Sequence, residues 1–193
     1  MELAILNWMQ AQLRCGMLDA VRPWVSRICD HGEVWILLAA VLLLHRKTRR
    51  VGAAVTLALL LDLLCCNVLL KPAIARVRPC DVNTALALLI PRPEDGSFPS
   101  GHSAASFAAV AALLGMESRL WRPAFVLAVL ICFSRLYLYV HWPSDVLAGV
   151  VLGTLLGFLA ARIIQRGERR LAEKRCTSLP GGRQSETLRN GGK

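Results

Sequence analysis

Long, mainly apolar runs constrain the fold of this chain more than any other feature of its sequence. The runs at residues 51–70 and 143–164 are close in length to the ~20 residues that a helix needs to cross the hydrocarbon core of a bilayer. Shorter apolar runs cover residues 33–45, 103–116 and 124–139. Apolar residues make up 55% of the 193 positions, which is typical of helical membrane proteins. We therefore expect an all-α fold, a polytopic membrane bundle of about five to six spans.

The two ends of the chain differ from this apolar centre. Two stretches, 2–15 and 17–29, mix apolar and polar side chains at helical spacing, and we assign them to helices at the membrane interface. A first span bent around Gly16 is the alternative. Residues 166–193 are basic and become rich in Gly, Ser and Arg, which predicts a partly disordered tail. Residues 31–165 then form the membrane domain.

Basic residues in short turns predict the orientation in the cell membrane. The run at 33–45 is followed by four cations, Arg46, Lys47, Arg49 and Arg50. Cytoplasmic loops are enriched in Lys and Arg, so we place this turn, the turn containing Arg119 and Arg122, and the basic tail in the cytoplasm. Alternating spans then place the loop 71–102 and the turn 135–145 on the extracytoplasmic face.

The net charge of +10 suggests two classes of partner. Membrane lipids fit cations that flank apolar spans. Nucleic acid is the competing class, but the basic segments have no aromatic stacking platform beside them, so we expect no nucleic-acid binding. The seven cysteines show no C-x-x-C spacing, and we interpret them as small apolar side chains rather than as disulfides or a metal site.

The sequence Pro99-Ser100-Gly101-His102 joins the polar loop to the apolar run at 103–116. A polar loop followed by Pro-Ser-Gly and small residues predicts a helix N-terminus, where free N–H groups and the helix dipole favour an anion such as phosphate. Gly101 permits close approach of the backbone, Ser100 adds a hydroxyl donor, and His102 can titrate near neutral pH. A lone histidine is more often a satisfied polar residue, so the motif needs support from elsewhere.

Cations on the expected extracytoplasmic face supply that support. Four of them, Lys71, Arg76, Arg78 and Arg135, oppose the orientation bias. Each alone could extend to a lipid phosphate, but four cations near two histidines favour an anionic headgroup.

His141 precedes a helix that Pro143 starts, and Asp145 lies in its first turn. The Asp145 carboxylate can accept a ring N–H of His141 and orient it, or it can simply favour the helix dipole.

Asp62 and Asn67 are polar groups within the run at 51–70. Polar side chains at that depth are costly. We favour an interhelical hydrogen bond that fixes packing for Asp62, and a polar relay is the alternative.

Three motifs together resemble the type 2 phosphatidic acid phosphatase (PAP2) superfamily. They are K-x6-R-P (Lys71, Arg78, Pro79), P-S-G-H (Pro99 to His102) and S-R-x5-H-x3-D (Ser134, Arg135, His141, Asp145). All three are complete and in the expected order, and the resemblance covers about residues 30–165. Residues 1–30 and the tail lie outside it.

The resemblance implies a role for each matched position. It implies that His141 is the nucleophile that forms a phosphohistidine, that Asp145 orients it, and that His102 is the general acid and then the base for water. It implies a cradle for the phosphoryl oxygens made of Lys71, Arg78, Ser100, Gly101 and Arg135. Neither a metal nor another cofactor is implied. Arg76 lies outside the motif, and we expect at most a supporting role for it.

The resemblance also implies the substrate class, a lipid phosphate or diphosphate. The chain is similar to the small bacterial members of undecaprenyl-diphosphate phosphatase type, so undecaprenyl diphosphate is the substrate we expect. Phosphatidylglycerophosphate and phosphatidic acid are alternatives with the same chemistry. Two other classes are a vanadium-dependent haloperoxidase, which the apolar spans disfavour, and a non-catalytic lipid-binding protein, which would not need both histidines.

Overall fold

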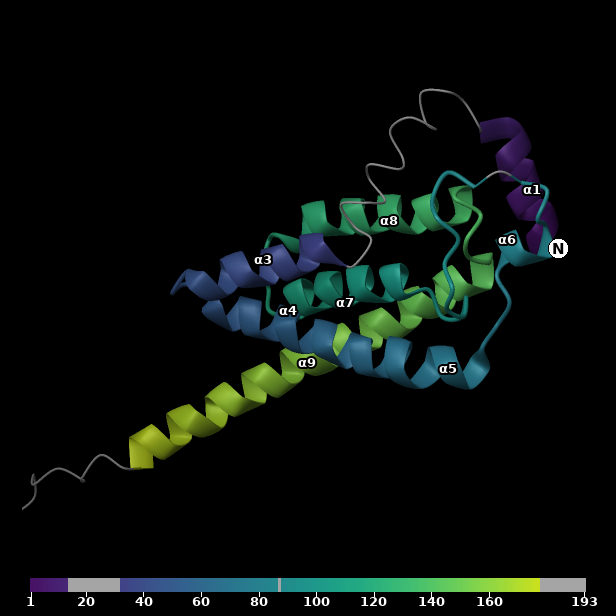
Figure 1. Ribbon diagram of the computed structural model, residues 1–193. Helices are drawn as coiled ribbons and strands as arrows, with labels where there is room; N and C mark the ends of the chain where they lie inside the picture. Colours follow the sequence, from purple (N-terminus) through teal and green to yellow (C-terminus); the bar gives the residue numbers. More distant parts are fainter. Residues whose placement is uncertain (14–31, 87, 178–193) are drawn as a thin grey trace, which may run out of the picture.

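A computed structural model describes residues 1–13, 32–86 and 88–177, and helices are its only regular secondary structure within these ranges (Figure 1). The all-α prediction is therefore confirmed. The elements are α1 (Glu2–Leu13), α3 (Glu33–Leu44), α4 (Arg49–Asp62), the π-helix η1 (Leu63–Leu70), α5 (Lys71–Ile74), α6 (Pro79–Val82), α7 (Gly101–Gly115), α8 (Trp121–Tyr137) and α9 (Pro143–Thr177). The predicted interfacial helix at 17–29, the bend at Gly16 and the disorder near the C-terminus lie outside the described residues.

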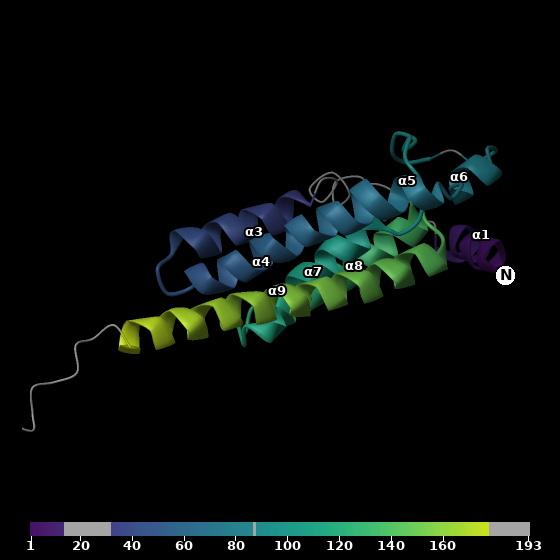
Figure 2. The same cartoon turned by 90° about the horizontal axis from the view of Figure 1, so that it is seen from below.

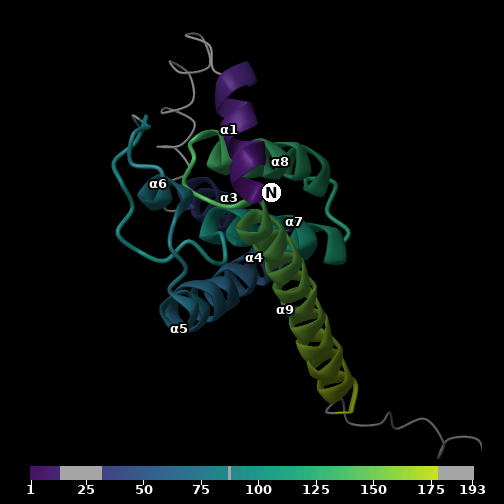
Figure 3. The ribbon, with the colours of Figure 1, turned by 90° about the vertical axis from the view of Figure 1, so that its right-hand side faces the viewer.

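The apolar runs of the sequence form the long helices of a bundle. Helices α3, α4, α7, α8 and α9 run side by side, with α7 among the others (Figures 1 and 2). The turns at 45–48 and 116–120 lie at one end of the bundle. The connection from α5 to α7 lies at the other end, and α1 lies across that same end (Figure 3). This arrangement separates the basic turns from the motif residues.

Alanine and glycine bring α7 and α9 together. A Cβ atom added at Gly149, Gly153 or Gly157 would lie 2.6, 2.1 or 2.4 Å from the carbonyl oxygens of Ser100, Ala104 and Ala108, respectively. These contacts recur every four residues on both helices, so the backbones pack directly against each other. Gly149, Gly153 and Gly157 therefore form a stripe of small residues along which the two helices pack.

Apolar side chains also cover the outside of the bundle. Leu37, Leu60 and Leu155 are each more than half exposed. The segments Arg49–Val82 and Pro143–Lys174 are long and apolar enough to cross a membrane, and α3 and α7 are shorter apolar helices. An apolar exterior on long helices is the pattern that a lipid environment requires.

Two segments contain more helix than the sequence analysis expects. Helix α9 continues past the expected end of the span at residue 164 to Thr177, because residues 165–177 are rich in helix formers such as Arg, Glu, Ala and Leu. Arg50 Nε binds Glu168 Oε1 at 2.7 Å and ties this extension to α4. The long polar loop contains α5 and α6, which have proline in their first turns.

Candidate active site

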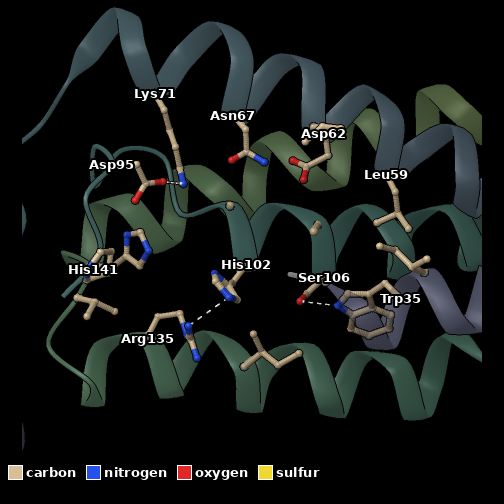
Figure 4. Close-up of a pocket in the computed structure, with 18 of the residues that line it drawn as sticks. Trp35, Leu59, Asp62, Asn67, Lys71, Asp95, His102, Ser106, Arg135 and His141 are labelled. Carbon is tan, nitrogen blue, oxygen red and sulfur yellow. Dashed lines mark hydrogen bonds and ion pairs between the residues drawn. The ribbon is translucent and has the colours of Figure 1, made fainter. Parts of the chain in front are cut away.

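Residues of α3, α4, η1, α7 and α8 and of the adjoining loops line one cavity of about 930 Å³ (Figure 4). Its charged end is lined by six of the eight residues that the sequence analysis selects, Lys71, Arg78, Gly101, His102, Arg135 and His141. The other two, Ser100 and Asp145, are fully buried beside it, where the Ser100 N–H donates to the Asp145 carbonyl oxygen at 3.0 Å. The structure thus brings all three motifs to one place.

His141 lies in the turn between α8 and α9, and its ring is held by a backbone group. Its Nδ1 atom is 2.8 Å from the Ser97 carbonyl oxygen. Because a carbonyl only accepts, this hydrogen bond assigns the proton to Nδ1 and leaves a lone pair on Nε2. Nε2 lies 3.4 Å from Arg78 Nη1, at the cavity. The ring therefore presents an unprotonated nitrogen beside a cation that can hold an anion.

Burial keeps this imidazole neutral. It lowers the pKa of His141 to about 4, although the neighbouring Asp145 carboxylate acts in the opposite direction. The charges of Arg78 and Lys71 lower the same pKa further. At neutral pH, His141 is therefore a neutral imidazole with a free lone pair, the form that a nucleophile requires.

Asp145 is engaged by several groups besides His141. Its Oδ2 atom accepts the Trp142 N–H at 2.9 Å and lies 3.7 Å from His141 Nδ1, which is longer than a hydrogen bond. Its Oδ1 atom binds Arg76 Nη1 at 2.6 Å. Arg76 in turn binds Glu2 Oε2 at 2.7 Å, so an ion-pair chain links α1 to the turn that carries His141. The Arg76 guanidinium supports this turn rather than lining the cavity's charged end.

His102 and Arg135 face each other across the cavity from α7 and α8. Arg135 Nη1 lies 3.2 Å from His102 Nε2 (Figure 4). Arg135 is 2% exposed, and its Nε donates to Ser134 Oγ at 3.2 Å. The guanidinium is therefore fixed in a position from which it can reach both the imidazole and an anion in the cavity.

Lys71 and Arg78 share one carboxylate, that of Asp95. Arg78 Nη2 binds Asp95 Oδ1 at 2.6 Å, and Lys71 Nζ binds Asp95 Oδ2 (Figure 4). Burial acts to raise the pKa of Asp95, but the hydrogen bonds and charges of Lys71 and Arg78 outweigh it and lower the pKa to about 2. One anionic group can thus contact both cations at once, which is the geometry that a phosphoryl group requires.

Gly101 is needed at the first position of α7 because the cavity wall is close. A Cβ atom at this position would lie 3.0 Å from Asn67 Oδ1 and 3.7 Å from Lys71 Nζ. Any side chain would therefore occupy space between the lysine and the helix N-terminus. The sequence analysis expects the Gly101 backbone to approach an anion closely, and that role stays a prediction.

Three contributions at this site are missed by the sequence analysis. They are the Ser97 carbonyl, the Asp95 carboxylate and Glu2. A backbone carbonyl carries no side-chain signal, and neither acid belongs to one of the three motifs. Only the fold brings them to the motif residues. Among the described residues, no group of three or more His, Cys, Asp or Glu side chains gathers as a metal site.

Comparison with known proteins adds the family. The PAP2 superfamily model matches residues 47–169, which contain all three motifs. The chain belongs to the PAP2 superfamily. The protein is accordingly a PAP2-type lipid phosphatase, and PAP2 phosphatases are metal-independent.

Several PAP2 relatives resemble the chain along much of its length. An undecaprenyl-diphosphatase from Sulfolobus acidocaldarius is 37% identical over 69% of this chain, and the match spans 65% of that protein. A decaprenylphosphoryl-5-phosphoribose phosphatase from Mycobacterium tuberculosis is 35% identical over 90% of this chain and 96% of its own length. The crystal structure of a transmembrane PAP2-type phosphatidylglycerolphosphate phosphatase from Bacillus subtilis is similar with a TM-score of 0.69, at 29% identity, over 86% of this chain and 85% of that one. These likenesses identify a membrane protein.

Proposed function

We propose that this PAP2 protein removes a phosphate from a polyprenyl-linked phosphate, with undecaprenyl diphosphate as the first substrate. The observation that supports this most directly is the cavity, which continues from the cationic site to apolar residues of α3 and α4, Trp35, Ile36, Leu59 and Leu60. Ile36 and Leu60 are each 57% exposed, so this end of the cavity lies at the outer surface of the bundle. A phosphate can bind at one end while an apolar chain leaves toward lipid at the other.

The first chemical step is attack on phosphorus by His141. Lys71, Arg78 and Arg135 hold the phosphoryl oxygens, with Ser100 and Gly101 shaping the cradle at the α7 N-terminus. The Nε2 lone pair of His141 forms the bond to phosphorus while the bond from phosphorus to the leaving oxygen breaks. His102 gives a proton to that oxygen. Asp145 stabilises the positive charge that develops on the His141 ring, whose Nδ1 stays bound to Ser97.

Hydrolysis of the phosphohistidine completes the cycle. His102, now neutral, takes a proton from a water molecule, and the resulting hydroxide attacks phosphorus. The bond between phosphorus and Nε2 breaks, its electron pair returns to His141, and inorganic phosphate leaves. His102 has then regained the proton that it gave up in the first step.

The site faces the extracytoplasmic side in this proposal. The connection from α5 to α7 lies at the end of the bundle opposite to the basic turns and the α9 extension (Figure 1), and Arg78 and Asp95 of this connection line the cavity. The positive-inside rule places the basic turns in the cytoplasm, and the outer leaflet then supplies the substrate.

A second candidate substrate is a phosphate on a sugar that is joined to a polyprenyl chain. The match to the mycobacterial decaprenylphosphoryl-5-phosphoribose phosphatase, over 96% of that protein, favours it. Phosphatidylglycerophosphate and phosphatidic acid have the same phosphate chemistry and belong in the same test.

Phosphate release by the purified protein, in EDTA, tests the proposed function. The panel contains undecaprenyl diphosphate, phosphatidylglycerophosphate, phosphatidic acid and a polyprenylphosphoryl ribose phosphate, with the His141→Ala protein as background. We expect release from at least one polyprenyl substrate at a rate several orders of magnitude above that background. Release only from glycerophospholipids would overturn the polyprenyl proposal. No release from any lipid would favour the non-catalytic lipid-binding alternative.

A further inference from the structure

Asp62 is a buried acid in the wall of this same cavity, and one of its two carboxylate oxygens has no hydrogen-bond partner. It is 3% exposed, and its Oδ1 atom is buried with no hydrogen-bond partner. The interhelical hydrogen bond that the sequence analysis favours for this side chain is therefore not formed by Oδ1. An unsatisfied buried carboxylate oxygen is costly to a fold, and such a group is retained where a ligand can satisfy it.

The helix changes form where Asp62 stands. Residues Leu63–Leu70 are π-helical, directly after Asp62 at the end of α4. A π-helix brings residues about five apart to one side, so Asp62, Asn67 and Lys71 all line the cavity. Figure 4 shows these three side chains in a row along one face of the helix. Lys71 is at the phosphate end of that row, and Asp62 is at the deeper end.

Two donors in the cavity wall, those of Trp35 and Thr56, are already used. Trp35 Nε1 donates to Ser106 Oγ at 3.0 Å (Figure 4). The Thr56 hydroxyl donates to the Gly52 carbonyl oxygen of its own helix at 2.9 Å. The remaining lining toward α3 is mainly apolar. A purely hydrocarbon tail in this passage would leave Asp62 unsatisfied, whereas a ligand with a hydroxyl group at this depth would satisfy it.

We propose that Asp62 forms a subsite for a hydroxyl group in the part of the substrate that joins the phosphate to the lipid chain. The subsite accepts a hydrogen bond from a polyol unit, a sugar or a glycerol, that follows the phosphate into the cavity. This inference rests on the proposed lipid-phosphatase function and revises the order of its candidate substrates: a polyprenyl-linked sugar phosphate comes before undecaprenyl diphosphate, whose chain follows the two phosphates directly. Asp62 favours phosphomonoesters of hydroxylated lipids over lipids in which the chain follows the phosphate directly. A carboxylate here also disfavours a second phosphate at the same depth.

A matched pair of substrates tests the subsite. The first is 1-oleoylglycerol 3-phosphate, and the second is its analogue without the 2-hydroxyl group, 1-oleoylpropane-1,3-diol 3-phosphate. We expect the wild-type kcat/KM to be about 10-fold or more higher for the hydroxylated lipid, because the site loses a buried hydrogen bond with the other. In Asp62→Leu, the ratio of the two kcat/KM values should fall to about 1, because kcat/KM should decrease for the hydroxylated lipid and stay unchanged for its analogue. Asp62→Asn keeps an acceptor oxygen and should retain part of the preference.

The control is Thr56→Val. It removes a hydroxyl group that lines the same cavity but already donates to a carbonyl oxygen within α4, so the ratio should stay unchanged.

Thermal unfolding gives a second readout. Replacing an unpartnered buried carboxylate by leucine should raise the midpoint, whereas a fall would indicate a structural role for Asp62 and overturn the subsite. A wild-type ratio near 1, or an unchanged ratio in Asp62→Leu, would also overturn it. Hydrolysis of neither lipid and of no panel substrate would instead overturn the phosphatase proposal.

Discussion

At the scale of single residues, the chemistry of this site depends on one lone pair. His141 keeps Nε2 unprotonated because the Ser97 carbonyl binds Nδ1 and because burial opposes a positive charge on the ring. Arg78 lies against the same nitrogen and carries the charge that an incoming phosphoryl group needs. In the proposed mechanism, the imidazole and the guanidinium thus have separate tasks, one as electron-pair donor and the other as counterion.

The titration of His141 follows from this arrangement. The chain has four histidines, so histidine NMR on labelled protein can follow each ring, with His141→Gln to assign the signal. We expect the His141 ring to stay neutral through pH 6 and to titrate near pH 4, in keeping with a pKa lowered to about 4 by burial. A midpoint near the ordinary value of about 6.5 would contradict this.

The same shift predicts a pH dependence of stability. The folded-state pKa of His141 lies below that of an unfolded histidine, so the unfolded chain binds more protons between pH ~4 and ~6.5. The contribution of His141 to the free energy of unfolding is fully present above pH ~6.5 and is lost as the pH falls toward 4. His141→Gln removes the titrating group, so in that window its free energy of unfolding should fall less steeply with pH than that of the wild type.

At the scale of elements, the distance between α7 and α9 sets the geometry of the site. Helix α7 carries His102 in its first turn, and α9 carries Asp145 in its first turn. The contact through Gly149, Gly153 and Gly157 fixes how these two helices lie against each other. A change in the packing of this pair moves the two catalytic candidates relative to each other.

Gly153→Ala is expected to damage both stability and activity. Its Cβ would lie 2.1 Å from the Ala104 carbonyl oxygen, so the two backbones must separate. We expect a loss of about 1–3 kcal/mol in the free energy of unfolding and a clear fall in kcat. The matched control is Gly167→Ala in the same helix, where an added Cβ has no atom within 4 Å. This substitution should raise the free energy of unfolding by up to ~1 kcal/mol, because alanine favours a helix over glycine. Thermal unfolding in detergent and phosphate release measure both effects, and equal behaviour of the two variants would contradict this role for the stripe.

At the scale of the whole molecule, the sequence predicts the long helices and the residues around the cavity. Apolar runs locate the helices because burial and lipid contact both select for them, and the three motifs locate Lys71, His102 and His141. The contacts that hold these side chains do not follow from the sequence. The π-helix after Asp62, the Asp95 bridge and the Ser97 carbonyl depend on how distant segments pack. Residue types and hydrophobic periodicity do not predict which distant segments pack together.

The orientation of the molecule has a direct test. Glu94→Cys and His45→Cys each place one thiol at an exposed position, in a chain whose own cysteines are replaced by alanine or serine. A membrane-impermeant thiol reagent should label position 94 in intact cells and position 45 only after lysis, because the basic turn beside His45 favours the cytoplasm. The reverse pattern would place the cavity at the cytoplasmic face and would favour a phospholipid of the inner leaflet as substrate.

The central claim is that a phosphate passes through a bond to His141, and trapping that bond tests it most directly. His102→Ala protein is mixed with an aryl phosphate carrying a radioactive phosphoryl group, whose leaving oxygen needs no proton from His102, so that the first step still proceeds. The reaction is quenched in base within one turnover, and the labelled peptide is mapped by mass spectrometry. Without its general base for water, the intermediate should decay slowly and accumulate. We predict label on the peptide that contains His141, and none in the His102→Ala/His141→Ala protein. Phosphate release without any labelled peptide, or label on another residue, would contradict the proposed mechanism.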